Sequence, residues 1–282
     1  MQRERFTPYL LIAPSIIFLL FLFAVPVFEA LSLALRAADG SLTLANFQRM
    51  SRDLYFTDAV RNTVLLVVIT VPLQLVLALA MAVLLQGIER GRDLILYVWT
   101  IPLGVSDLAA GIVWLAIFTE RGYLNSFFYW TGLIQRPQIW LSYESPAILF
   151  LAVVVAEIWR ATAIMFVILV AGLQLIPKEY GEAAEVFGAN AWRRFWRVTL
   201  PLLRPSMQVA LILRTIAAFG VFSVALALGG RDIPILAGEA YYWYNLYRNP
   251  AIASAYAVII MGISIAITVV YLRLLRSRQE EL

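Results

Sequence analysis

The chain has 282 residues, of which 62% are hydrophobic and only 14% charged, and its formal net charge is +4. A soluble domain cannot hide that much apolar surface, so the composition predicts an all-α polytopic membrane protein. The absence of Cys and His excludes disulfides, thiolate chemistry and His-containing metal sites. The sequence contains no basic tract, so nucleic acid is not an expected partner.

The long apolar intervals predict the transmembrane helices, because a helix needs about 20 apolar residues to cross the hydrocarbon layer. Six intervals meet this requirement: 9–35, 59–85, 94–118, 146–176, 206–228 and 251–275. They predict one transmembrane domain over residues 1–282. The first interval could also be a cleaved signal, but it is longer than the ~7–15 residues of a signal core, which favours an uncleaved span.

The distribution of Lys and Arg predicts the orientation. Basic residues are more frequent at the N-terminus, after the second and fourth spans and in the C-terminal tail than in the other connections. The positive-inside rule therefore places both termini and the interval 177–205 in the cytoplasm. The outer segment after the third span is rich in aromatic residues, and Trp130, Trp140 and Tyr143 are expected to be interfacial anchors rather than a ligand-binding set.

The interval 177–205 is the longest one between spans that still has a helical, charged pattern. Pro177 suits a first helical position, and Glu179 favours the positive end of a helix dipole. Gly188 is a plausible stop and Asn190 a plausible cap for a second short helix, with Pro201 starting the next span. Two short helices at a membrane surface predict a docking element, and the alternative is an ordinary amphipathic loop helix.

The same interval resembles the "EAA" signature of binding-protein-dependent ABC-importer permeases. The matching residues are Glu182-Ala183-Ala184, Gly188-Ala189, Phe195, Val198, Leu200-Pro201 and Pro205. The resemblance covers nearly the whole chain. Asn46-Phe47 and Gly122-Tyr123-Leu124-Asn125 resemble the carbohydrate branch, and the short tail resembles the maltose-transporter F-type subunit. One departure is Phe187, because the family usually has an acidic residue before this glycine.

The resemblance implies the fold, the activity and the partners. The fold would be that of a type I ABC importer permease, with six transmembrane helices and a cytoplasmic coupling helix that seats in an ATPase. The activity would be uptake of a sugar, such as maltose or trehalose, across the inner membrane of a prokaryote. The partners would be a second, G-type permease, two copies of an ABC ATPase and an extracytoplasmic binding protein. The expected ATPase-docking residues are Glu179, Glu182, Ala183, Ala184, Gly188, Ala189 and Arg193.

The chain itself cannot form a phosphate-binding G-x-x-x-x-G-K-[ST] loop, because its only lysine, Lys178, follows Pro177. If ATP drives transport, ATP and its Mg²⁺ must therefore bind to a partner. No cofactor, metal or catalytic residue is expected in this chain.

Charged residues at bilayer depth are costly, about 2.5–3.5 kcal/mol each, so they tend to face a partner or a polar cavity. Glu157 and Arg160 are three residues apart and can pair on one helix face, whereas Arg214 needs a partner from another span. Asp107, beside a helix break at Ile101-Pro102, is the first choice for a cavity residue. A sugar needs hydrogen-bonding groups and an aromatic face. The candidate pathway residues are Asp107, Trp114, Glu157, Phe219, Ser223 and Tyr242.

Three alternatives remain open at the level of the sequence. The same machinery could carry glycerol phosphate or a polyamine, although a phosphorylated cargo favours more inward-facing arginines than Arg160 and Arg214. A secondary transporter would work without an ATPase and usually shows inverted repeats, which are not evident here. An intramembrane enzyme would need a carboxylate pair or a serine dyad, but Asp107 and Glu157 do not share a motif.

Overall fold

The computed structural model describes residues 2–37 and 39–274, and its regular structure is helical apart from one isolated bridge between Arg36 and Leu42. Among these residues, five helices are long and apolar enough to cross a membrane, and a sharply bent helix pair brings the number of spans to as many as six. This architecture confirms the predicted all-α polytopic fold.

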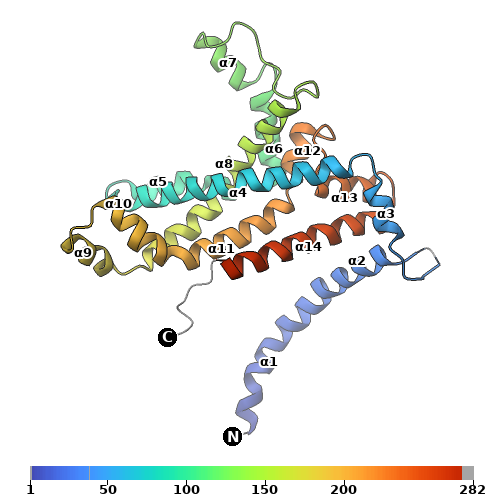
Figure 1. Ribbon diagram of the computed structural model, residues 1–282, viewed down its shortest axis with the longest axis horizontal. Coiled ribbons are helices and arrows are strands. Elements are labelled where there is room, and N and C mark those ends of the chain that lie inside the picture. The colour runs from blue at the N-terminus through green and yellow to red at the C-terminus, as the bar shows by residue number, and fades with distance from the viewer. Residues whose placement is uncertain (1, 38, 275–282) are drawn as a thin grey trace.

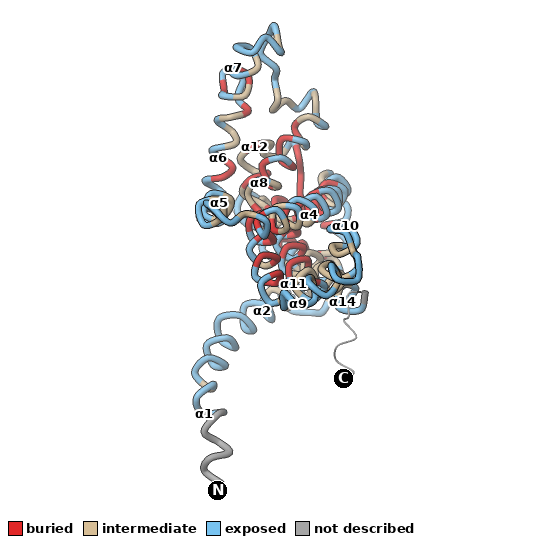
Figure 2. The backbone as a smooth tube through the Cα atoms, turned by 90° about the vertical axis from the view of Figure 1, so that its left-hand side faces the viewer, coloured by how far each residue is buried: buried red, intermediate tan, exposed pale blue. Residues whose placement is uncertain are grey.

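Four long helices form the body of the molecule (Figure 1). They are α4 (Phe56–Gln86), α8 (Pro146–Gln174), α11 (Leu200–Phe219) and α14 (Pro250–Leu274). Helices α4, α8 and α11 pack against one another, and α14 packs against α11. Their apolar side chains form one buried cluster that includes Leu85, Phe166, Leu169 and Leu203. Figure 2 shows the buried segments gathered where these helices meet.

The first span lies mostly outside this body. It consists of α1 (Gln2–Leu19), a π turn (Leu20–Ala24) and α2 (Val25–Leu35). Its most apolar window contains no buried residue, and Figure 2 shows the coloured part of this span mostly exposed up to the end of α2. Only the end of α2 is packed, where it contacts α14 and α3 (Ala45–Ser51). A bare apolar helix of this kind needs lipid or another chain to cover it.

Asn46 in α3 explains how the chain turns after the first span. Its Nδ2 donates to the backbone oxygens of Leu33, Ala34 and Arg36 at 3.3, 3.1 and 3.0 Å. These carbonyls lie at the end of α2, where the helix supplies no backbone partners. Asn46 therefore caps the first span.

The third span, predicted over 94–118 with a helix break at Ile101-Pro102, is broken at that point. It comprises α5 (Arg92–Thr100), a 3₁₀ turn (Ile101–Gly104) and α6 (Asp107–Phe118), which runs on towards α7 (Tyr123–Trp130). The two halves are bent by 101°. Pro102 lies at the start of the 3₁₀ turn, and the Oγ of Ser106 accepts a hydrogen bond from the Ala109 N–H at 3.2 Å, so a new helix begins there.

The segment beyond α7 is organised by Asn125. Its Nδ2 donates to the oxygens of Glu120 and Gln138, and its Oδ1 accepts from the Trp140 Nε1 at 3.0 Å. Trp140 is therefore packed within this loop, whereas Trp130 and Tyr143 are exposed. Their role as interfacial anchors stays a prediction.

The fifth span differs from its prediction. A continuous helix runs from Ala191 to Phe219 through α10 (Ala191–Arg194), a π turn (Phe195–Thr199) and α11. The predicted restart at Pro201 lies within one residue of the start of α11 at Leu200, but no break separates α11 from α10. The π turn ends at Thr199, and the helix passes through the proline, which has no N–H to donate. At the other end, the helix stops at Phe219, and α12 (Ser223–Gly229) is a separate element.

Gly172 in α8 is a close-packing point against α11. A Cβ atom at this position would lie 2.2 Å from Ser206 Oγ and 2.5 Å from Ser206 Cβ. We expect Gly172→Ala to lower the free energy of unfolding by about 1–3 kcal/mol, the usual cost of overpacking. The control is Gly262→Ala in α14, where a Cβ meets nothing within 4 Å. Thermal unfolding in detergent measures both, and equal melting temperatures would contradict this packing.

Candidate functional site

The first candidate site is the elbow at one end of the molecule, formed by α9 (Lys178–Val186) and the start of the α10–α11 helix (Figure 1). Gly188 has a φ of +77°, which glycine adopts without strain. The Oδ1 of Asn190 accepts a hydrogen bond from the Arg193 N–H at 2.9 Å, as predicted for a cap. An ion pair between Glu185 and Arg194 joins the two arms of the elbow. The predicted helix–glycine–helix turn is therefore present, although its second arm continues into the fifth span.

The elbow exposes both its predicted residues and a set of apolar ones. Glu179, Glu182, Ala183, Gly188 and Arg193 are exposed, whereas Ala184 and Ala189 are half-buried. The large side chains at the turn are also uncovered, with Val186 85% and Phe187 90% exposed. An exposed apolar tip of this kind is typical of an interaction surface.

The second candidate site is a charge network inside the helix body, centred on Glu157 of α8. Its Oε1 accepts hydrogen bonds from Arg160 Nη2 at 2.7 Å and from Arg214 Nη2 at 2.6 Å, and its Oε2 accepts from Arg160 Nε at 3.2 Å. The Glu157 side chain is completely buried. The predicted pairing of Glu157 with Arg160 is confirmed.

Arg214 of α11 finds its partners on other spans, as predicted. Besides Glu157 of α8, its Nε donates to Gln74 Oε1 of α4 at 2.6 Å. Gln74 in turn donates through Nε2 to the Glu157 backbone oxygen at 2.8 Å. The Arg214 side chain is 1% exposed, and its Nη1 has no hydrogen-bond partner among the described residues. The network therefore ties three spans together at one buried point.

A cavity of about 350 Å³ opens beside this network, between the bend of the third span and helices α8 and α11. Asp107, at the first position of α6, lines it, and its Oδ1 accepts from Arg160 Nη1 at 2.7 Å. Arg160 and Arg214 also line the cavity, together with Ser106. The cavity thus offers guanidinium donors, a carboxylate acceptor and a hydroxyl, which are the groups that bind polar solutes.

The structure brings together only part of the predicted pathway set. Asp107 and Glu157 share Arg160, but of these two acids only Asp107 lines the cavity. Trp114 packs against an apolar cluster, with its ring stacked 5.2 Å from that of Phe118, and does not line the cavity. Phe219 is buried in the core of the long helices instead, so it cannot offer its ring to a solute. Ser223 begins α12, which packs against α6. These two do not line the cavity.

Tyr242 belongs to a different cluster near α3, which was not anticipated from the sequence. Arg231 donates to Glu239 Oε2 at 2.7 Å and to Tyr247 Oη at 2.7 Å, and its guanidinium lies 4.8 Å from the Tyr242 ring centre. Burial raises the pKa of Glu239, whereas the Arg231 charge opposes this rise. Beside them, Trp243 Nε1 donates to Asp53 Oδ2 at 2.6 Å. Most of these residues lie within 231–247, but Asp53 is 190 positions from Trp243, so no local spacing brings it in.

The cluster fixes the short helix α13 (Leu236–Asn245) to the rest of the fold. Helix α13 packs mainly against α14, and Tyr256 of α14 donates to the same Asp53 carboxylate at 3.1 Å. Ion pairs, cation–π contacts and hydrogen bonds therefore hold α13 in place. This arrangement indicates a structural role for Tyr242 rather than a place in the solute path.

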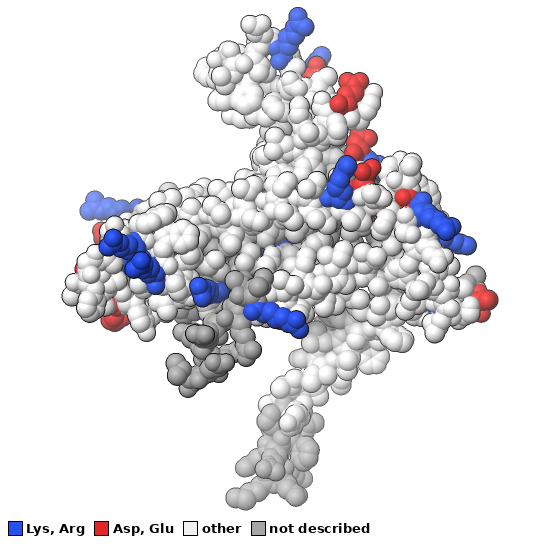
Figure 3. All heavy atoms as spheres, viewed as in Figure 1, with Lys and Arg blue, Asp and Glu red and all other residues white. Residues whose placement is uncertain are grey.

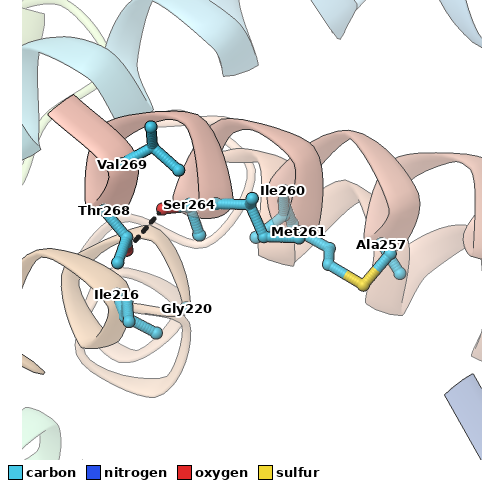
Figure 4. Close-up of a pocket in the computed structure, with 9 residues that line it drawn as sticks. Ile216, Gly220, Ala257, Ile260, Met261, Ser264, Thr268 and Val269 are labelled. Atoms are coloured by element: carbon cyan, nitrogen blue, oxygen red, sulfur yellow. Dashed lines mark hydrogen bonds between the residues drawn. The ribbon is translucent and has the colours of Figure 1, made fainter. Parts of the chain in front are cut away.

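An apolar groove of about 550 Å³ lies between α11 and α14 (Figure 4). Ile216, Ile260 and Met261 line it, and the hydrogen bond drawn there joins Thr268 Oγ1 to the Ser264 backbone oxygen at 2.8 Å. Because this polar pair is satisfied within the helix, the groove suits an apolar occupant and not a sugar. No group of three or more acidic side chains in the described part of the chain could hold a metal ion.

The surface charge follows the helix arrangement. Figure 3 shows charged side chains concentrated at the end with α9 and α10, at the opposite end and on the protruding α7 region. The surface over the long helices is mostly uncharged, as contact with lipid requires. A polytopic helical bundle with a polar internal cavity and an exposed elbow defines a membrane-embedded transport component.

The comparison with known proteins agrees with this class. A family model described as "Binding-protein-dependent transport system inner membrane component" matches residues 89–279. The chain belongs to this family of inner membrane transport components.

Relatives and solved structures extend over nearly the whole chain. The trehalose transport system permease protein SugA of Mycobacterium tuberculosis is 30% identical, covering 97% of this chain and 90% of its own length. The trehalose/maltose transport system permease protein MalF of Thermococcus litoralis is 31% identical, covering 99% and 96%. The sn-glycerol-3-phosphate transport system permease protein UgpA of Agrobacterium fabrum is 32% identical, covering 98% and 96%.

The fold is also found in a solved structure. A chain from a bacterial alginate ABC transporter, crystallised with its alginate pentasaccharide-bound periplasmic protein, has a TM-score of 0.82. It is 18% identical, and the match covers 97% of this chain and 95% of that one. At this identity the match supports the fold alone. The recognition of an ABC-importer permease fold from the sequence is confirmed.

Proposed function

We propose that this chain is the permease subunit of an ATP-driven importer for a di- or oligosaccharide such as maltose or trehalose. An extracytoplasmic binding protein delivers the sugar. The chain pairs with a second, G-type permease, and two copies of an ABC ATPase bind ATP and Mg²⁺. The complex lies in the cytoplasmic membrane of a prokaryote with both termini of this chain in the cytoplasm. The chain itself performs no covalent chemistry.

The observation that carries this proposal is the exposed elbow at α9. The chain has no loop that could bind nucleotide phosphates, so mechanical work must reach it from outside. The second arm of the elbow continues without a break into the fifth span, because one helix runs from Ala191 to Phe219. The docking residues are Glu179, Glu182, Ala183, Ala184, Gly188, Ala189 and Arg193. A force on those in α9 would reach α11 through the Gly188 turn and the ion pair between Glu185 and Arg194.

The helix that begins at the elbow reaches the charge network inside the helix body. Arg214 lies on α11 and holds Glu157 of α8 and Gln74 of α4. Closure of the ATPase pair would move the elbow and rock α11 with its neighbours, so that the cavity beside Asp107 opens alternately to the two sides. This step converts ATP hydrolysis into sugar movement without a covalent intermediate on this chain.

The groups that line the cavity indicate the kind of cargo. Its lining offers both hydrogen-bond donors and an acceptor. The relatives named for trehalose and maltose support a sugar, whereas the relative named for glycerol 3-phosphate supports a phosphorylated polyol as the second candidate. Binding measurements with neutral and phosphorylated cargo separate the two.

Cross-linking tests the docking proposal. Because the sequence contains no cysteine, an introduced cysteine is the single thiol of this chain. We expect Ala183→Cys carrying a maleimide-linked photo-cross-linker, which needs no thiol on the partner, to form an adduct with an ATPase that co-purifies from native membranes. Gly40→Cys, in the turn after the first span, is the control and should give no such adduct. Isolation of the Ala183→Cys chain without any ATPase adduct would contradict the docking role.

A further inference from the structure

The two acidic residues of the internal network are not equivalent. Glu157 is completely buried and accepts hydrogen bonds from both Arg160 and Arg214. Asp107 has a half-exposed side chain at the cavity, and its only hydrogen bond in the described structure is the one from Arg160 Nη1. Glu157 therefore holds the spans together, whereas Asp107 is the acid that a solute in the cavity can reach.

Asp107 completes the charge balance of the cavity. The guanidiniums of Arg160 and Arg214 are matched by the carboxylates of Glu157 and Asp107, so the four groups together carry no net charge when ionised. Without Asp107, one positive charge would remain uncompensated beside the cavity. Such a charge at the cavity lining would attract an anionic solute.

This balance determines which cargo the cavity accepts. A neutral polyhydroxyl solute can bind to Arg160, whose side chain is 16% exposed and lines the cavity, and to the Asp107 carboxylate. An anionic solute would meet an arginine pair that is already neutralised, and the Asp107 carboxylate would repel it. Like charges placed together exclude the wrong ligand.

We infer that Asp107 is a specificity-determining residue that makes this permease select uncharged sugars over phosphorylated ones. The inference rests on the proposed function, in which the cavity is part of the solute path. Removing the negative charge of Asp107 should free Arg160 to bind a phosphate group and shift the preference towards anionic cargo.

The substitution Asp107→Asn removes the charge with little change in shape. The helix start is preserved, because Ser106 rather than Asp107 caps α6. Asp107→Glu keeps the charge and should keep the wild-type preference. Asp93→Asn, at the exposed start of α5, is the matched control outside the cavity.

Equilibrium dialysis of the complete transporter complex in nanodiscs provides the test. The probes are radiolabelled trehalose and trehalose 6-phosphate, which differ only in the phosphate. Wild type, Asp107→Glu and Asp93→Asn should bind trehalose more tightly. In Asp107→Asn, the ratio of the two dissociation constants should move towards the phosphorylated sugar by about tenfold or more.

The outcomes separate the inference from the function on which it rests. If wild type binds trehalose and Asp107→Asn leaves the ratio unchanged, the inference is wrong and the cavity remains a sugar site. If the wild-type complex binds neither probe, both the cavity as a sugar path and the inference are overturned. Size-exclusion chromatography of each complex shows that the compared variants are assembled.

Discussion

Glu157→Ala should lower the free energy of unfolding by about 3–5 kcal/mol, the usual cost of removing one partner from a buried ion pair. The reason is Arg214, which is 1% exposed and would lose its only carboxylate contact. Arg160 would keep Asp107 and is less affected. Thermal unfolding of the purified chain in detergent measures the loss.

A double substitution distinguishes charge from packing in this experiment. Replacing both buried partners, as Glu157→Leu with Arg214→Met, removes the uncompensated charge and should recover much of the stability. Sugar transport should not recover, because the network no longer joins α11 to α8. A double variant as unstable as the single one would contradict the charge argument.

Gly188→Trp should uncouple ATP hydrolysis from uptake, so that the rate of transport falls by about tenfold or more. A tenfold fall corresponds to a free-energy difference of about 1.4 kcal/mol. A Cβ at Gly188 meets nothing within 4 Å in this chain, although its φ of +77° strains any other residue. The indole would therefore project from the elbow and obstruct a docked ATPase. Uptake and ATPase activity in the same vesicles measure the coupling.

The matched control is Gly40→Trp. Gly40 has a φ of +85° and equally open surroundings, but it lies in the turn after the first span. The two variants carry similar local strain, so a difference between them reports the docking surface. Normal transport by Gly188→Trp would count against the elbow as the site where the ATPase acts.

The features of the fold that depend on local sequence pattern could be predicted from the sequence. Hydropathy located the spans, because a membrane helix must be apolar over its whole length. The three-residue spacing of Glu157 and Arg160 predicted their pairing, and the chain's arginine in the fifth span predicted a partner on another helix. The small residues and prolines of 177–205 predicted the elbow.

The remaining features depend on tertiary packing. Asp107 and Arg160 are 53 positions apart and meet only because the third span bends by 101°. The prediction treated Phe219 as a solute-facing ring, but packing of α11 buries it in the core. In the Arg231 cluster, Asp53 meets Trp243 from 190 positions away. Composition and periodicity do not report such long-range contacts.

A secondary transporter would be driven by an ion gradient and not by ATP, and this difference can be measured. ATP-driven uptake of labelled sugar into proteoliposomes, containing the complete complex and supplied with binding protein, tests the central claim directly. We expect uptake only with ATP at the ATPase side, and none from an imposed proton or sodium gradient alone. Uptake that follows an ion gradient without ATP would contradict the proposal that the α9 elbow receives the driving force from an ATPase.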